Sequence, residues 1–177
     1  MTQTPLPELD RFRVLFDRLV TVTNDWISQT PPDRLEWGPV DNQNVRFGDR
    51  VSLVTIKSLY VHVAVGEHHW MRNLKQCREG ATIPLPKNPE LTAQLMRGDF
   101  VGEAMKLHQG NMRILDTFTE DDLRKSIHFS DCTWSTMGFL WAIYAHRAYH
   151  LGNIDIYLRQ SDTKAPDFFH FHPNMMA

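Results

Sequence analysis

The stretch that decides the fold is WSTMGFLWAIYAHRAYHLGNIDIYLRQ, residues 134–160. Its apolar residues recur three and four positions apart, which is the spacing of one buried face of an α-helix. The residues on this inward face are Phe139, Ala142, Ile143, Tyr149, Ile154, Tyr157 and Leu158. The spacing predicts one long helix that begins near Ser135 or Thr136.

Two histidines, His146 and His150, lie on or beside this inward face. Because four residues rise about 6 Å and return to nearly the same side of a helix, both imidazoles can reach one point. Two neutral imidazoles that converge inside a helical protein suit a divalent metal ion. The alternative is a pair of histidines at the edge of the core, bonded to backbone or carboxylate groups. Such pairs also arise by chance, so the spacing alone leaves both interpretations open.

The composition is typical of a soluble globular chain with one domain and a sizeable core, at 177 residues, 42% hydrophobic and 23% charged. A formal net charge of −2 argues against a broad nucleic-acid-binding surface. No apolar run is long enough to span a membrane, and the first residues lack a signal-peptide pattern. The two cysteines do not make a disulfide framework. We therefore expect a cytoplasmic protein that binds neither nucleic acid nor membrane.

The same periodicity predicts three further long helices, over residues 7–30, 51–79 and 99–117, with a short helical turn at 91–96. Gly80 is placed to stop the second helix, and Asp99 to cap the third. Long helices with sizeable connections indicate an all-α fold, a four-helix bundle with a crossover connection. Residues 1–160 are expected to form this single domain, and residues 161–177 an irregular C-terminal tail.

A catalytic metal typically has three protein ligands and keeps one position open, so a third ligand is expected from another helix. His62 is the first candidate, because it lies in the most apolar helix, where an imidazole needs a partner. His108, on the inward face of the third helix, is the rival. For either residue the alternative is an ordinary hydrogen bond in the core. The pair His170 and His172 is interpreted as part of a solvated tail.

Two segments, SLYVHVAVGEHHWM at residues 58–71 and the stretch from Thr133 to Arg159, resemble the DinB family of metalloenzymes, which have the DinB/YfiT-like fold. Members commonly have a histidine in the second helix with a glutamate five residues later, here His62 and Glu67. Their last helix has an HxxxHxGxI pattern, which here begins at His146. The resemblance implies a helical bundle with a metal site made by His62, His146 and His150. Asn153 stands where the family often has glutamine.

Four residues are candidates for groups that support the metal ligands, namely Glu67, His108, Asn153 and Tyr157. Glu67 falls on an apolar face, where it either accepts a hydrogen bond from a ligand imidazole or forms a structural ion pair with Arg147 or Arg159. A tyrosine or amide near the histidines can orient a substrate, but core packing is the favoured interpretation of Tyr149, Asn153 and Tyr157. The sequence assigns no catalytic residue beyond the metal ligands.

Three imidazoles add no negative charge, so a bound divalent cation stays a strong Lewis acid. Zinc or nickel is expected first, and iron also accepts imidazole. Because Arg147 follows His146, the HExxH pattern of zinc proteases is absent. Thiol-dependent relatives imply a metal-dependent transferase that adds a low-molecular-weight thiol to a small electrophilic substrate. The alternatives are a metal-dependent hydrolase and a metal-binding or stress-induced interaction bundle without turnover. A homodimer is plausible for this fold.

Overall fold

The structure is a computed structural model that describes residues 6–39 and 54–165. The long helices are α1 (Pro7–Gln29), α2 (Ile56–Gln76), α4 (Phe100–Leu115) and α6 (Thr136–Gln160). The shorter elements are a 3₁₀ turn (Pro32–Arg34), α3 (Pro89–Leu95), α5 (Glu120–Arg124), β1 (Ala81–Thr82), β2 (Ser126–Phe129) and β3 (Cys132–Ser135). The predicted four-helix bundle is confirmed, with a small sheet added to it. The division into a domain and a tail stays a prediction. Within the described ranges, no helix is both long and apolar enough to cross a bilayer.

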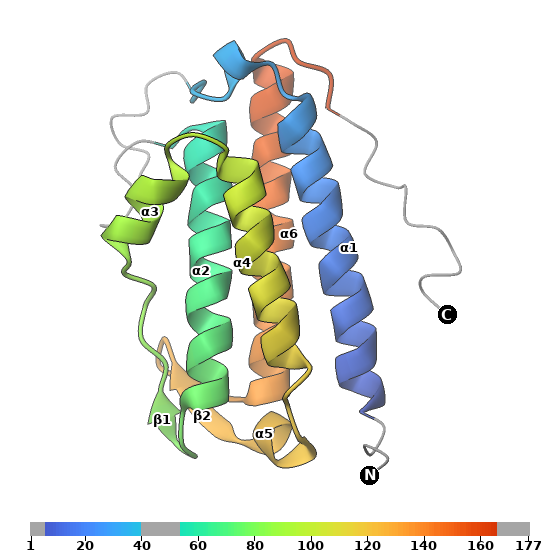
Figure 1. Cartoon of the computed structure of the whole chain (residues 1–177), viewed down its shortest axis with the longest axis vertical. Coiled ribbons are helices and arrows are strands. Elements are labelled where there is room, and N and C mark those ends of the chain that lie inside the picture. The colour runs from blue at the N-terminus through green and yellow to red at the C-terminus, as the bar shows by residue number, and fades with distance from the viewer. Residues whose placement is uncertain (1–5, 40–53, 166–177) are drawn as a thin grey trace.

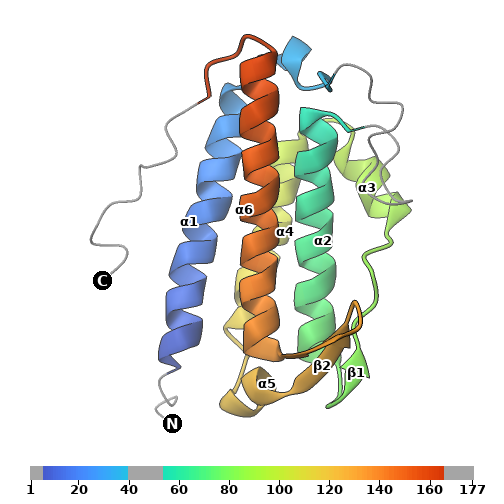
Figure 2. The ribbon, with the colours of Figure 1, turned by 180° about the vertical axis from the view of Figure 1, so that it is seen from behind.

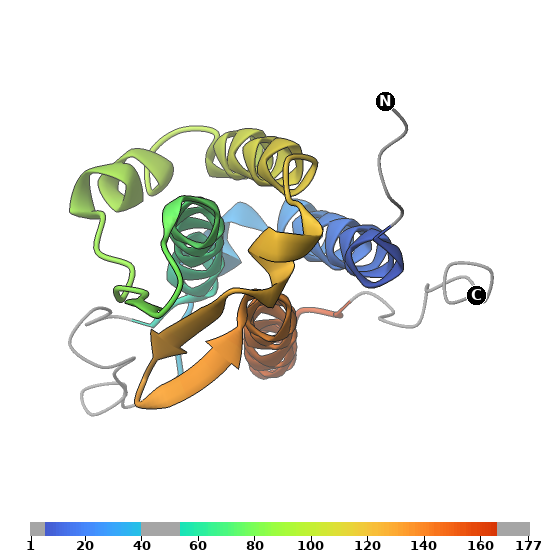
Figure 3. The same cartoon turned by 90° about the horizontal axis from the view of Figure 1, so that it is seen from below.

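The four long helices stand at the corners of a square when the bundle is seen from one end (Figure 3). α2 packs against α4 and α6, and α1 packs against the same two helices. α1 and α6 run in one direction, whereas α2 and α4 run in the other (Figures 1 and 2). Because α2 and α4 are parallel neighbours, the chain between them must return along the bundle, and it does so through β1 and α3. This return is a crossover of the kind that the long connections predict.

The ends of α2 differ from the predicted range, which is too long. The helix begins at Ile56 because Thr55 and Ser58 form a capping box, in which each side chain accepts a hydrogen bond from the other residue's backbone N–H. It ends at Gln76, and Gly80 is not its cap. Gly80 has a φ of 71° and donates its N–H to the Ser126 carbonyl at 2.8 Å, which aligns β1 with β2. Residues 51–53 lie outside the described part.

A three-stranded sheet closes one end of the bundle (Figure 3). β1 is parallel to β2, and β2 pairs with β3 as an antiparallel hairpin. Ser130 and Asp131 form its two-residue turn with φ values of 49° and 62°, as a type I′ turn requires. Ser135, the last residue of β3, caps α6 by accepting a hydrogen bond from the Gly138 N–H at 3.0 Å. The sheet therefore fixes where the longest helix begins.

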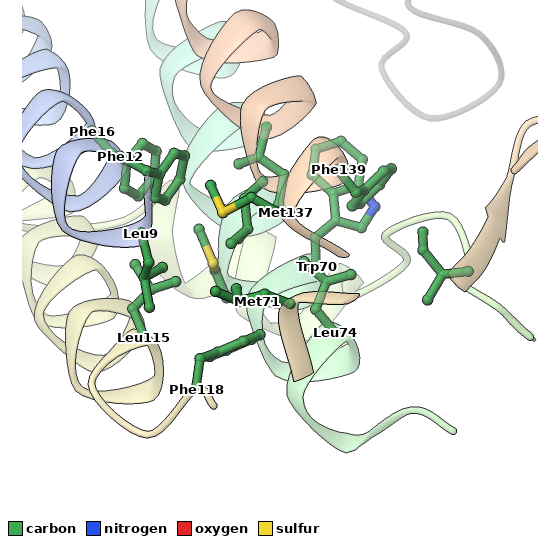
Figure 4. Packing of buried hydrophobic residues seen from close by; sticks show 14 of the residues in the cluster. Leu9, Phe12, Phe16, Trp70, Met71, Leu74, Leu115, Phe118, Met137 and Phe139 are labelled. Carbon is green, nitrogen blue, oxygen red and sulfur yellow. The ribbon is translucent and has the colours of Figure 1, made fainter. Parts of the chain in front are cut away.

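The buried apolar side chains form two clusters along the bundle. The cluster nearer the sheet includes Phe12, Phe16, Trp70, Met71, Leu115 and Phe139 (Figure 4). The other includes Leu19, Trp26, Leu59, Tyr60, Ile154 and Leu158. Along α6, the first cluster ends at Ile143 and the second begins at Leu151. Between them lie His146, Arg147 and His150, so polar side chains separate the clusters on this helix.

Candidate metal centre

Three histidines from two helices converge where α2 faces α6. His62 comes from α2, and His146 and His150 come from α6. One ring nitrogen of each lies within 4.8 Å of those of the other two. The ring centroid of His62 is 5.4 Å from that of His146 and 5.1 Å from that of His150. The fold therefore brings together the three residues that the sequence indicated as metal ligands.

The separation of these nitrogens fits a divalent cation. In a tetrahedral zinc site with Zn–N bonds of about 2.0–2.1 Å, neighbouring ligand nitrogens are about 3.3 Å apart. The Nε2 atoms of His146 and His150 already lie 3.2 Å apart. The third nitrogen, within 4.8 Å of both, needs only a side-chain adjustment to close the site. Because the cluster consists of imidazoles alone, it suits zinc, nickel or iron better than calcium or magnesium.

His150 is held in the form that binds metals. Burial and then the neighbouring His62 lower the pKa of His150 from its ordinary 6.5 to about 4. The ring is therefore neutral at neutral pH and has a nitrogen lone pair to offer. A cation does not have to displace a proton from this residue.

Trp70 forms an aromatic wall beside the centre. Its indole packs edge to face against the His146 imidazole, with ring centroids 5.0 Å apart. The same indole contacts Phe129 and Phe139 edge to face, at 5.8 and 5.9 Å. Because Phe129 lies on β2 and Phe139 on α6, the hairpin helps to fix the position of one ligand ring.

The two tyrosines near the histidines have different surroundings. The Tyr149 ring lies 5.2 Å from the His150 ring, but the residue is 65% exposed, so the prediction that it packs in the core is wrong. It precedes His150 and therefore projects about 100° away from the buried face of α6. Tyr157 is half-buried and packs edge to face on Trp37, at 5.6 Å. Burial raises the pKa of Tyr157, as expected for a packing residue.

Asn153 lies one turn beyond His150 and faces its other ring nitrogen. The distance from Asn153 Nδ2 to His150 Nδ1 is 3.5 Å. When Nε2 of a neutral histidine binds a metal, Nδ1 carries a proton that needs an acceptor. Turning the Asn153 amide, whose oxygen and nitrogen are interchangeable in shape, places its oxygen there. We therefore expect Asn153 to orient the His150 ring.

Replacing Asn153 with leucine is expected to lower the affinity for zinc about 10- to 100-fold, because His150 loses the acceptor that fixes its ring. Competition with a chromogenic chelator measures this affinity. Tyr157→Phe is the matched control on the same helix and is expected to bind zinc as tightly as the wild type. Equal affinities of the wild type and Asn153→Leu would show that the amide has no orienting role.

Glu67 and Arg147 form a buried ion pair across the same helix interface. The Nε and Nη2 groups of Arg147 donate to the two carboxylate oxygens of Glu67, both at 2.6 Å. The Arg147 side chain is 3% exposed and the Glu67 side chain 1%. Of the two interpretations of Glu67, the structure therefore supports the ion pair, with Arg147 as partner. Arg159 instead pairs with Asp155 at the surface.

His108 lies apart from the three histidines, in a contact between α4 and α1. Its Nε2 is 2.8 Å from Asp17 Oδ1, and its ring packs on Phe16 at 5.4 Å. α4 and α6 stand at opposite corners of the bundle (Figure 3). His108 is therefore a buried histidine with a carboxylate partner, and the structure does not support its predicted place beside the metal ligands. His170 and His172 lie outside the described residues.

These observations define a four-helix bundle with a three-histidine cluster between α2 and α6. The sequence profile of the DinB family matches residues 20–168, and the chain belongs to this family. No curated protein matches it in sequence.

Two solved structures from Bacillus subtilis share the fold. YfiT has a TM-score of 0.66 and 13% identity, with 93% of this chain and 94% of YfiT covered, and it is described as a probable metal-dependent hydrolase with an unusual four-helix bundle topology. YjoA, a DinB-like protein, has a TM-score of 0.64 and 18% identity, with 89% of this chain and 96% of YjoA covered. At these identities the likeness shows the fold alone.

Proposed function

We propose that this chain is a divalent-metal-dependent enzyme whose cation is held by His62, His146 and His150. The observation that carries the proposal is the convergence of three imidazole nitrogens within 4.8 Å at one helix interface. Structural zinc sites are closed by four protein ligands, whereas three leave a position open for water or substrate. A cation held there lowers the pKa of a water or thiol that binds beside it and polarises a carbonyl group. We propose zinc first, with nickel and iron as the other metals that these ligands accept.

Hydrolysis of a small-molecule substrate is the reaction that we propose first. YfiT, which shares the fold, is described as a probable metal-dependent hydrolase. Three neutral ligands also leave the cation its full charge, which favours ionisation of water. The chain lacks the glutamate base of zinc proteases, because Arg147 follows His146 and both oxygens of Glu67 accept hydrogen bonds from Arg147. We therefore do not propose peptide hydrolysis of the zinc-protease type.

Transfer of a low-molecular-weight thiol to an electrophile is the second candidate. The engagement of Glu67 with Arg147 favours it, because a reaction without a carboxylate base needs a nucleophile that ionises easily. A thiol has a pKa of about 8.5, against about 15.7 for bulk water. We place it second because none of the described contacts identifies a thiol-binding group.

The two reactions are separated by assaying the zinc-loaded protein with p-nitrophenyl acetate, and with an electrophilic chloro-dinitrobenzene in the presence and absence of cysteine. We expect ester hydrolysis that EDTA abolishes, that zinc restores and that does not depend on the thiol. The His150→Ala variant is the control for background hydrolysis. Turnover only with cysteine would favour thiol transfer. Stoichiometric metal binding without turnover in either assay would contradict both and favour an interaction bundle.

The homodimer and the cytoplasmic location stay predictions from the sequence, as does the absence of a nucleic-acid partner. Size-exclusion chromatography with light scattering tests the first, and we expect twice the chain mass of 20.7 kDa.

A further inference from the structure

A second polar site lies on α2, nearer the C-terminal end of the helix than the candidate metal centre. A cavity of about 210 Å³ is lined by one helical surface and by the start of α3. Its polar lining residues are His68, His69, Arg72, Asn73, Gln76 and Asn88. Among the residues that the structure describes, no acidic one lines the cavity. The lining therefore offers one guanidinium, two imidazoles and three amides, which together favour a negatively charged ligand.

Arg72 is the fixed positive charge of this cavity. It is exposed at the rim, and within the described ranges it has neither an ion-pair nor a hydrogen-bond partner for its side chain. A guanidinium presents a planar set of donors that matches a carboxylate or a phosphate group with two parallel hydrogen bonds. Since no described carboxylate pairs with it, Arg72 is available for an anion from solution.

The walls of the cavity are held in place by contacts with other elements. His68 Nδ1 lies 3.0 Å from Oδ1 of Asn111, a residue of α4 that is 1% exposed. His69 Nε2 lies 3.2 Å from the Pro84 carbonyl oxygen, which can only accept, so this nitrogen carries a proton. Asn73 Nδ2 donates to the His69 carbonyl at 2.7 Å. The side chains of His68, His69 and Asn73 are therefore ordered before a ligand arrives, which lowers the entropic cost of binding.

We propose that this cavity binds the carboxylate or phosphate group of a small molecule, with Arg72 as the anchoring cation. Val65 and Leu91 give the lining an apolar part for the carbon atoms of the ligand. The volume is below the range of about 300–1,000 Å³ for drug-sized ligands, so a small acid or the acidic end of a longer molecule fits. The metal proposal is not needed for this binding.

The cavity also lies on the face of α2 that leads to the candidate metal centre. His62 and His69 are seven residues apart, which is two turns and about 10 Å along one face of the helix. Arg72 is ten residues from His62, a rise of about 15 Å along the helix, so an acid anchored at Arg72 with a reactive group about that far away is a suitable substrate for the proposed enzyme. This last link, unlike the binding itself, rests on the proposed function.

The test is an NMR titration of the ¹⁵N-labelled full chain, treated with EDTA, with sodium phosphate and separately with sodium succinate at constant ionic strength. We expect saturable shifts at the amides of residues 65–76 and 88–91. Arg72→Gln is expected to weaken binding at least tenfold. Arg78→Gln, which removes the same charge from an exposed residue outside the cavity, should leave it unchanged. Tighter binding of succinate would identify a carboxylate site, and tighter binding of phosphate a phosphate site.

Three results would overturn the proposal. Shifts that grow linearly with either anion would show no site, and equal effects of Arg72→Gln and Arg78→Gln would show only an effect of net charge. Loss of anion binding in His150→Ala would place the anion at the three histidines instead. Retained anion binding in a His150→Ala variant that no longer binds zinc supports the cavity and the metal centre as separate sites. Anion binding at the cavity in a protein that never binds zinc refutes only the proposed function.

Discussion

Replacing His150 with alanine is expected to abolish stoichiometric binding of a divalent cation, and His62→Ala and His146→Ala are expected to do the same. The physical reason is that each variant leaves two imidazoles, and two neutral ligands hold a cation far less tightly than three that converge within 4.8 Å. Metal analysis of the purified proteins and zinc titration by calorimetry measure the effect. His150→Ala gives the sharpest test, because its neutral ring is the most buried of the three.

His108→Ala and His69→Ala are the matched controls, because both remove a histidine from the bundle helices without touching the cluster. His108 bonds to Asp17, and His69 bonds to the Pro84 carbonyl. Both variants are expected to bind one equivalent of zinc, although His108→Ala leaves a small cavity against Phe16. Far-UV circular dichroism should show that all five variants stay helical. Undiminished metal content in His62→Ala, or loss of metal in His108→Ala, would contradict the assignment.

Breaking the Glu67–Arg147 pair is expected to lower the free energy of unfolding by about 3–5 kcal/mol. Glu67→Gln leaves the guanidinium buried beside a neutral amide, so that one charge has lost its counter-charge in the interior. Arg147 has little to compensate with, because its Nη1 atom is already buried without a hydrogen-bond partner among the described residues. Urea denaturation followed by tryptophan fluorescence measures the loss. At this chain length it corresponds to a melting temperature lower by roughly 6–20 °C.

The double variant Glu67→Met with Arg147→Met separates two contributions to the free energy of unfolding. One is the destabilisation by an unpaired buried charge, and the other is the net stabilisation by the intact ion pair. Replacing both partners by apolar side chains of similar length is expected to restore most of the lost stability, as in other buried pairs. Arg159→Gln is the control for loss of an arginine on α6, and it should change stability by less than about 0.5 kcal/mol, since the side chain is 68% exposed. A Glu67→Gln protein as stable as the wild type would show that the interior tolerates the free guanidinium.

The helices and the pair His146 and His150 were predictable from the sequence because both depend on local spacing. Apolar residues three and four apart define a helix whatever surrounds it, and His146 and His150 share a face for the same reason. His62 required more, since spacing cannot say which face of one helix meets which face of another. Its assignment came from the family resemblance, and the structure now places its ring beside the other two. The partner of Glu67 was predicted only as one of two arginines, because the pair joins residues 80 positions apart.

The sheet and the anion-binding cavity were not predicted, and the reason is the same for both. The strands are two to four residues long, and the Ser130-Asp131 turn lacks the asparagine-glycine pair that usually marks a type I′ hairpin. The cavity forms only because the chain returns from β1 to α3 along the side of α2. His68 is half-buried there and bonds to Asn111 of α4. The spacing of apolar residues along the chain does not show which distant segments lie side by side in the fold.

The order of the helices along the chain has a consequence for biosynthesis. Of the four long helices of the bundle, α6 is the last to be synthesised, and it carries two of the three cluster imidazoles as well as the arginine that neutralises Glu67. A nascent chain that ends before α6 therefore exposes a lone His62 and an uncompensated carboxylate on an otherwise apolar flank of α2. Under the proposed function, metal capture must follow the docking of α6 on α2, and zinc uptake would report that this docking has occurred.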